Sequence, residues 1–219
     1  MRYLKYILAV LVVALSVPTI HAKKKVVDIY ELTFDENLET PIPANDNIAE
    51  RIVQFQGVVA EKLYEKNPNT WTMRDGEVIM MTFPASQLFA PNDTVLTEVG
   101  KVALKPLLPF LKTPGLYKML LLMHSDDTGS DEYTMELTRC RVNAVYDWID
   151  ANGSVDFVVP YALGATTPSV DDKGMEIPND SMENRKKNRR LEIYLVPEES
   201  MMELAKKGKI DLKILNIKK

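Results

Sequence analysis

The stretch that decides the fold reads "MHSDDTGSDEYTMELTRCRVNAVYDWI" and covers residues 123–149. It begins where an apolar run typical of a buried strand ends, turns at Gly129, and continues into a helix. Aspartates surround the turn, and the N-terminus of a helix favours negative charge. The helix carries two arginines, Arg139 and Arg141, and their positions around its axis indicate different environments.

The helix is amphipathic when residues 133–149 are projected at about 100° per residue. The arc predicted to face the protein body contains Tyr133, Leu137, Cys140, Ala144, Val145 and Trp148. Arg141 falls within this arc, whereas Arg139 falls on the opposite, solvent side. An unpaired buried charge costs on the order of several kcal/mol. Arg141 therefore needs a carboxylate partner, either within the protein or on a bound molecule.

Asp126 is a candidate for the other half of a binding site, because it follows the end of the apolar run that we expect to be a central strand. A carboxylate at the end of a strand and a guanidinium from the next helix can face one cleft. Together they match a zwitterion, since the carboxylate accepts an ammonium and the guanidinium fork binds a carboxylate through two hydrogen bonds. The alternative is an internal salt bridge between Asp126 and Arg141 without a ligand, and the pattern alone leaves both open.

Around this stretch the chain predicts an α/β sandwich, an α+β arrangement βαβαββ with helices packed on a mixed sheet. Strands are expected over residues 77–83, 116–123, 157–163 and 189–196, with a further short strand within 26–34. Helices are expected over 47–63, in part over 97–111, where Pro106 and Pro109 interrupt them, and after Pro197. A long polar loop is expected over 164–187.

The N-terminus has the pattern of a secretory signal peptide. Arg2 and Lys5 precede a ten-residue apolar run, and small residues ending at Ala22 predict cleavage there. An uncleaved membrane anchor is the alternative. Loss of these two of the 27 basic residues leaves 25 against 31 acidic residues, a net charge of −6. An acidic chain without a basic stripe argues against nucleic acid as a partner.

Other function classes are limited by composition. No window of about 18 or more apolar residues is present, so we expect no membrane-spanning helix. Cys140 is the only cysteine, and His124 is the only histidine after cleavage, so we expect neither a disulfide nor a histidine metal site, and no cofactor. A hydrolase that uses Cys140 and His124 is a remote alternative, because the inward arc is unsuited to a reactive thiolate.

Three sequence blocks together resemble the OmpA-like peptidoglycan-binding domain, the type found at the C-terminus of OmpA and in Pal and MotB. The first block is Met123, His124, Ser125, Asp126, Asp127, Thr128 and Gly129. The second is Tyr133, Thr134, Leu137, Thr138, Arg141, Val142 and Val145. The third is Asn184, Arg185, Asn188, Arg189, Arg190 and Leu191. The resemblance covers roughly residues 76–197.

This resemblance implies non-covalent binding of the meso-diaminopimelate of peptidoglycan stem peptides, without catalysis. The family's ligand-gripping residues correspond to Asp126 and Arg141, and its pocket asparagine corresponds to Thr134. Secondary candidates are His124, Asp127, Thr128, Gly129 and Arg189. Met123 and Ser125 stand where the family has glycine and threonine, and Thr134 lacks the second hydrogen-bonding group of an amide.

The predicted organisation is a signal peptide (1–22), an N-terminal extension (23–75), an OmpA-like domain (76–197), and a C-terminal helix and tail (198–219). We expect a short strand and a helix in the extension, which is a candidate surface for an envelope protein partner. The resemblance implies export to the periplasm and association with the cell wall and outer membrane of a Gram-negative-type envelope. The runner-up function is an envelope protein–protein interaction module whose ligand pocket has decayed.

Overall fold

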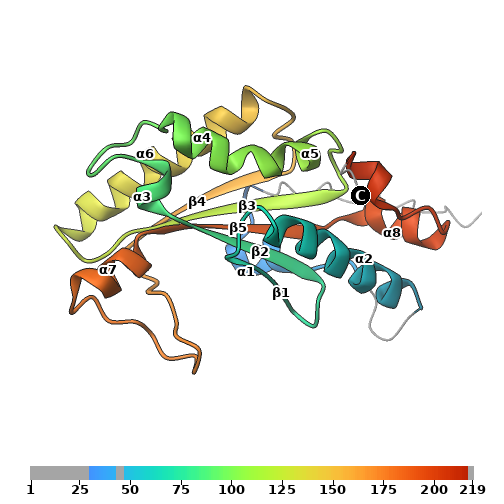
Figure 1. Ribbon diagram of the computed structural model, residues 1–219, viewed down its shortest axis with the longest axis horizontal. Helices are drawn as coiled ribbons and strands as arrows, with labels where there is room; N and C mark the ends of the chain where they lie inside the picture. The colour runs from blue at the N-terminus through green and yellow to red at the C-terminus, as the bar shows by residue number, and fades with distance from the viewer. Residues whose placement is uncertain (1–29, 43–46, 217–219) are drawn as a thin grey trace, which may run out of the picture.

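The structure, a computed structural model, describes residues 30–42 and 47–216 and has a mixed five-stranded sheet at its centre (Figure 1). The strands are β1 (Thr70–Met73), β2 (Val78–Pro84), β3 (Tyr117–His124), β4 (Val158–Gly164) and β5 (Arg190–Pro197). Their order across the sheet is β1-β2-β5-β3-β4. Only the β3–β4 pair is parallel within the described residues, and helix α6 forms the crossover between these two strands.

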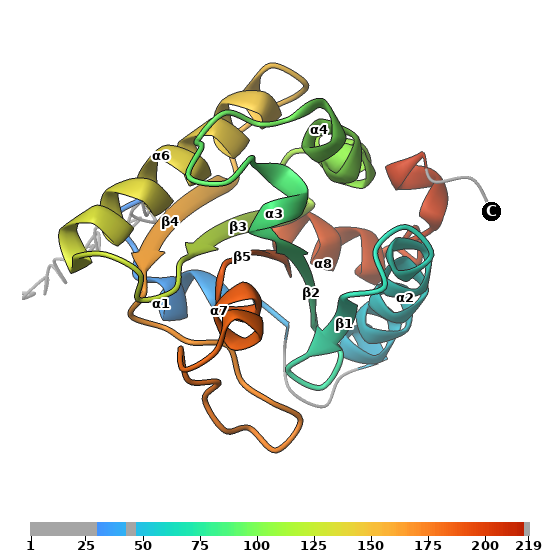
Figure 2. The ribbon, with the colours of Figure 1, turned by 60° about the vertical axis from the view of Figure 1, so that its left-hand side comes forward.

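Helices cover the two faces of the sheet unequally (Figure 2). On the first face lie α2 (Asn47–Tyr64), α3 (Ala85–Leu88), α4 (Glu98–Leu104), α5 (Leu108–Leu111), α6 (Asp131–Asp150) and α8 (Glu199–Lys206), with the 3₁₀ turns η1 (Lys105–Leu107) and η2 (Leu212–Leu215). On the second face lies the short α1 (Phe34–Leu38), and α7 (Met182–Asn188) lies beside that face before β5. The break between α4 and α5 contains Pro106 and Pro109, as predicted.

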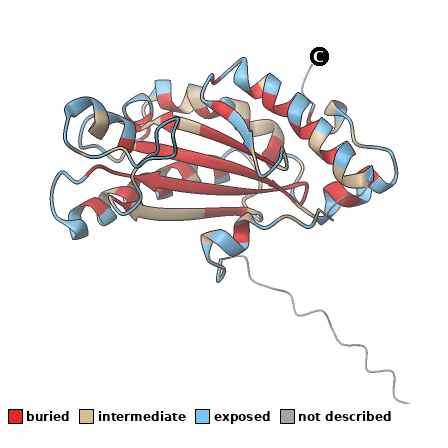
Figure 3. Ribbon diagram, turned by 90° about the horizontal axis from the view of Figure 1, so that it is seen from below, coloured by how far each residue is buried: buried red, intermediate tan, exposed pale blue. Residues whose placement is uncertain are grey.

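The central strands β3 and β5 form the middle of the core, because every residue of both strands is buried (Figure 3). Successive side chains of a strand point to opposite faces. In β5, Leu191, Ile193 and Leu195 therefore join the large apolar cluster under the helices, whereas Tyr194 and Val196 join a smaller cluster on the second face. The alternation thus places one apolar row of β5 under the helices and a partly polar row on the other side.

The predicted fold class and the four main strands are confirmed, but four local predictions are corrected. Part of the expected strand over 26–34 lies outside the described residues, and the rest is a turn leading into α1, because Thr33 and Glu36 form a capping box. β1 was not expected; it pairs with β2 as an edge strand. The expected loop over 164–187 contains α7, whose N-cap is Ser181.

The fourth correction concerns the buried stripe of α6. The helix begins at Asp131, since Ser130 accepts a hydrogen bond from the Tyr133 amide and caps it. Its buried residues are Thr134, Thr138, Arg141, Val142, Val145 and Ile149. Tyr133 is exposed and Cys140 is half-buried, so the projected arc was rotated by about one residue. Arg141 is buried and Arg139 is exposed, as predicted.

Residues 47–73 share the core of the sheet. Ile52, Phe55 and Val59 of α2 belong to the main apolar cluster, and the expected boundary at residues 75 and 76 falls inside the turn that joins β1 to β2. Residues 1–29, which include the predicted signal peptide, lie outside the described residues. In the part of the chain that is described, no helix is both long and apolar enough to cross a membrane.

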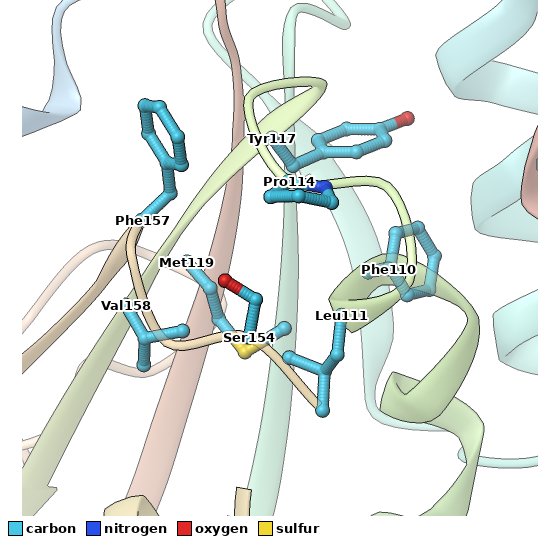
Figure 4. A pocket seen from close by; sticks show the side chains of 8 residues that line it. All are labelled: Phe110, Leu111, Pro114, Tyr117, Met119, Ser154, Phe157 and Val158. Atoms are coloured by element: carbon cyan, nitrogen blue, oxygen red, sulfur yellow. The ribbon is translucent and has the colours of Figure 1, made fainter. Parts of the chain in front are cut away.

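At one end of the helix–sheet layer a cavity of only about 10 Å³ remains (Figure 4). Its walls are Phe110, Leu111, Pro114, Tyr117, Met119, Ser154, Phe157 and Val158. A single water needs roughly 10–15 Å³, so this space is too small for a ligand. It is a packing gap of the core, and the larger hollow lies elsewhere.

Candidate ligand-binding site

The loop after β3 holds Asp126 in a buried position. The register of the β3–β4 pair shifts between Met123 and His124, and the Ser125 amide then donates to the Gly164 carbonyl oxygen at 2.6 Å. Asp126 is only 3% exposed, and its Oδ1 accepts a hydrogen bond from the Thr128 amide at 3.0 Å. The turn requires a glycine at position 129, where φ is +109°. The chain therefore fixes the carboxylate before the helix begins.

Arg141 is held by its stem and leaves the end of its guanidinium available. Its Nε donates to the backbone oxygen of Asp93 at 2.8 Å, and its Cζ lies 5.1 Å from the centre of the Phe89 ring, which is a cation–π contact. Within the described residues, no ion pair and no other hydrogen bond reaches this guanidinium. The side chain is 4% exposed, so a charge has been buried without a carboxylate at salt-bridge distance.

Asp126 and Arg141 line one pocket of about 590 Å³ between the α3–α4 loop and α6. Its walls are Ala85, Ser86, Phe89, Ala90, Pro91, Asn92, Ser125, Asp126, Thr128, Gly129, Tyr133, Leu137, Arg141 and Arg189. This volume suits a small molecule or the end of a polymer side chain. The two residues that the helix projection and the strand end singled out are thus brought together.

The internal salt bridge between Asp126 and Arg141, the alternative to a ligand, is replaced by a different ion pair. Oδ2 of Asp126 pairs with the guanidinium of Arg189, which lies between α7 and β5, and not with Arg141. The side chain of Arg189 is 39% exposed and lies at the mouth of the pocket. The pocket therefore contains two guanidinium groups for one carboxylate, an excess of one positive charge that an anionic group would balance.

The environment of Arg141 disfavours its own charge. Burial is the largest cause of a lowered pKa for this guanidinium, and the positive charge of Arg189 also lowers it. Tyr133, Asp93 and Asp126 act in the opposite direction. An arginine remains charged under these conditions. A bound carboxylate would therefore relieve a desolvation penalty that the protein itself offsets only in part.

The remaining predicted site residues separate into two groups. Thr128, Gly129 and Arg189 line the pocket, and Asp127 is exposed beside it. Thr134 does not line it: this side chain is 2% exposed, faces Gly164 of β4, and donates to the Asp131 carbonyl oxygen at 3.0 Å.

His124 also lies outside the pocket walls. Its Nδ1 is 3.2 Å from the Thr167 carbonyl oxygen and its Nε2 is 3.4 Å from Oε2 of Glu192, so it links the loop after β4 to β5. Met123, the departure from the family's glycine, is fully buried in the main core. The residues at 123 and 134, where this chain departs from the family pattern, therefore lie outside the pocket walls.

Phe89 and the carbonyl group of Asp93 were missed by sequence reasoning. Both belong to the segment after β2, in which no site residue was predicted from the sequence. Gly100 allows α4 to pack against the backbone of Leu88, since a Cβ there would lie 2.6 Å from the Leu88 oxygen. The Phe89–Leu96 bridge then closes the loop over Arg141. No sequence pattern indicates which backbone carbonyl group will accept a hydrogen bond. The aromatic Phe89, next to "APND" (residues 90–93), could have indicated a wall of the pocket.

Cys140 and His124 do not form a dyad. The Cys140 thiol lies 3.3 Å from Oε1 of Glu136 on the outer side of α6, and this contact raises the pKa of the thiol. A cysteine nucleophile needs a lowered pKa. Nor does the described part of the chain contain a cluster of three or more His, Cys, Asp or Glu side chains that could hold a metal ion.

Comparison with solved structures identifies the fold. A MotB-like protein from Desulfovibrio vulgaris superposes with a TM-score of 0.57 at 20% sequence identity, over 68% of this chain and 98% of that one. The cell wall anchor of the T6SS from Pseudomonas aeruginosa gives a TM-score of 0.50 at 22% identity, again over 68% and 98%. No family model and no curated protein matches the sequence. The predicted resemblance is confirmed at the level of the fold, which is that of an OmpA-like domain.

Proposed function

We propose that this protein binds peptidoglycan non-covalently in the periplasm, through the meso-diaminopimelate of a stem peptide, and so anchors an envelope protein or complex to the cell wall. One observation carries the proposal. Arg141 is buried, the end of its guanidinium has no partner among the described residues, and Asp126 lines the same pocket. The fold likeness supports it, because one of the similar structures is described as a cell wall anchor.

The chemistry follows from the charges. The free end of a diaminopimelate residue carries an ammonium and a carboxylate on one carbon. The carboxylate would accept two parallel hydrogen bonds from Arg141, and the ammonium would donate to Asp126. Arg189 already pairs with Asp126, so it would either share this carboxylate or turn toward an anionic group of the ligand. Binding of this kind requires no bond to be made or broken, and we propose no enzymatic activity.

The cellular setting follows from the same proposal. A chain exported by the signal peptide at 1–22 would meet peptidoglycan in the periplasm, at the inner side of the outer membrane. The region 23–75 would then be available for an envelope protein partner, since α2 covers the sheet while half of its surface remains in solvent.

The test is co-sedimentation of the purified protein with diaminopimelate-type sacculi. Asp126→Ala and Arg141→Ala should each weaken binding by about 2–5 kcal/mol, the usual effect of removing one partner of a buried charge pair. Arg139→Ala is the matched control, because Arg139 lies two positions away, is exposed, and pairs with the exposed Glu136. If the Arg139 change weakens binding as much as the Arg141 change, the site assignment is wrong.

Walls that carry lysine in place of diaminopimelate provide a second control. Lysine lacks the distal carboxylate, so Arg141 would have no anion to bind and sedimentation should be weak. Equal binding to both kinds of wall would contradict recognition of the zwitterion.

The second candidate function is a protein–protein interaction module with a decayed pocket. The departures at Met123 and Thr134 were its evidence, and both residues are buried away from the pocket walls. The first function is therefore favoured. A wild-type protein that ignores diaminopimelate walls would favour the second.

A further inference from the structure

A second hollow lies on the opposite face of the sheet, close to the pocket. This groove has a volume of about 520 Å³ and runs between β1–β2, the loop after β4, and α7. Its floor consists of recessed side chains of β2 and β5, and its rim includes Trp71, which is 45% exposed on the edge strand. The lining of this groove is mainly apolar, with charged side chains toward α7, and an exposed tryptophan at its rim is a strong candidate for a ligand contact.

The side chains that line the groove change in character along the strands. Trp71, Met80 and Tyr194 lie in one row across the sheet, because Trp71 pairs with Met80 and Met80 pairs with Tyr194. Four residues earlier along β5 lies Arg190, opposite Pro84. An aromatic and apolar end and a cationic end are therefore separated by roughly 13 Å, at about 3.3 Å per strand residue.

The cationic end carries an excess of positive charge. Arg190 is paired with Glu192 at 2.6 Å, and this glutamate also contacts Tyr194 and His124. Lys186 and Lys187 of α7 line the same end. Within the described residues Lys186 makes no ion pair, and Lys187 contacts only the exposed Glu183, at 3.3 Å. An anionic group fits this end of the groove.

The cationic end adjoins the pocket that contains Asp126. Ala85 and Arg189 line the pocket, whereas their chain neighbours Pro84 and Arg190 line the groove. The Ala85 amide donates to the Arg189 carbonyl oxygen at 2.9 Å, so one pair of residues separates the two hollows. A ligand that leaves the pocket over this end of the sheet meets the lysines first and the aromatic row afterwards.

We propose that the groove binds the arm of the stem peptide that connects the diaminopimelate in the pocket to the glycan strand. In such stem peptides this arm carries, in order, the free carboxylate of a γ-linked glutamate, the methyl group of an alanine, and the sugar. The carboxylate lies against Lys186 and Lys187, and the sugar lies against the Trp71 ring. Two extended residues and a lactyl group, at about 3.3–3.6 Å per residue, cover most of the length between the two ends.

This inference rests on the proposed function, and a series of ligands separates the two. Calorimetric titration would compare free meso-diaminopimelate, the tetrapeptide L-Ala-γ-D-Glu-meso-diaminopimelate-D-Ala, and the same tetrapeptide linked to its disaccharide. The wild-type affinity should rise at each step. The Lys186→Ala/Lys187→Ala variant should lose the gain at the tetrapeptide, roughly 5-fold, as for exposed charge pairs. Trp71→Ala should lose the gain at the disaccharide, roughly 10-fold, as for an aromatic contact residue.

The controls are exposed residues of the same types outside the groove. Lys206→Ala and Tyr64→Ala should leave all three affinities unchanged. Equal wild-type affinity for the three ligands would overturn the groove proposal and leave the pocket proposal standing. No binding of any ligand would overturn the proposed function itself. If Trp71→Ala weakens free diaminopimelate as much as the disaccharide ligand, its effect is structural and the subsite assignment is wrong.

Discussion

The two faces of the sheet bury different kinds of side chain. Under the helices, the core consists of apolar side chains from every strand except β1, together with α2, α4, α5, α6 and α8. On the second face, a smaller apolar cluster lies under the five-residue α1, and next to it His124, Arg190 and Glu192 are buried. The first face is packed mainly by apolar side chains, whereas the second combines a smaller apolar cluster with buried charges that compensate one another.

The buried arginines on the two faces also have different partners. Arg190 on the second face has its carboxylate partner within the protein, Glu192. Arg141 on the first face contacts a backbone carbonyl group and an aromatic ring, and no carboxylate of the described residues lies at salt-bridge distance from it. Among the described residues the fold pairs one buried arginine with a carboxylate and the other only with neutral groups, and the proposed ligand would supply the missing anion.

The largest effect should come from the core under the helices, and two adjacent leucines allow a matched comparison. Leu121 points into that core and Leu120 points to the second face; both are fully buried. Leu→Ala in a core costs about 2–5 kcal/mol, depending on how far the site can relax. We expect Leu121→Ala to fall near the upper end and Leu120→Ala near the lower end, because α1 can move inward.

Urea denaturation of both variants measures this difference. If Leu120→Ala is the more destabilising change, the second face is as tightly packed as the first, and the comparison between the faces fails.

The second effect is the dependence of stability on pH, which should arise from the second face. Burial alone would raise the pKa of Glu192, but His124, Arg190 and Tyr194 together lower it from 4.5 to about 2. A group with a lowered pKa stabilises the fold above its unfolded pKa and loses that contribution as the pH falls toward its folded pKa. At 1.36 kcal/mol per pKa unit, the stability attributable to Glu192 should fall by about 3 kcal/mol between pH 5 and 2.

The measurement is the free energy of unfolding across that pH range for the wild type and for Glu192→Gln. The variant should be less stable at neutral pH, because Arg190 then lacks its anion, and its stability should change less between pH 5 and 2. Parallel curves for the two proteins would show that the acid sensitivity comes from other carboxylates.

Much of the first face could be predicted from sequence, because apolar periodicity records it directly. The runs at 77–83 and 116–123 predicted β2 and β3, and the pattern Ile48, Ile52, Phe55, Val59 and Leu63 predicted α2. The inward position of Arg141 was also predicted, although the arc was rotated by about one residue, because Thr134 and Thr138 are buried through hydrogen bonds to the backbone. Polar residues buried in this way are invisible to a hydrophobic pattern.

The second face was harder to predict. α1 has only five residues and one turn of apolar contacts, and β1 has only four residues at the sheet edge, so neither produces a clear period. The pairing of Asp126 with Arg189 joins residues 63 positions apart in the chain. Sequence motifs placed both residues in the family pattern, but only the β2–β5 and β3–β5 pairing brings the third block to the end of β3.

The smallest effect concerns how α1 covers the second face. Thr33 caps this helix: its hydroxyl accepts from the Glu36 amide, and the Glu36 carboxylate accepts from the Thr33 amide at 2.8 Å. The cap positions Phe34, whose ring lies 5.3 Å from that of Tyr194 and 6.0 Å from that of Tyr161. Thr33→Ala should destabilise the protein by about 1 kcal/mol, the typical effect of losing an N-cap.

Thr33→Ser, which keeps the hydroxyl, is the control and should be close to the wild type. If α1 packs only against the second face, Thr33→Ala should cost less stability in a Leu120→Ala background, because the apolar surface beneath α1 is reduced there. In a Leu121→Ala background the stability cost of Thr33→Ala should be unchanged. A double-mutant cycle measures both couplings, and equal coupling to the two leucines would mean that the faces do not respond separately.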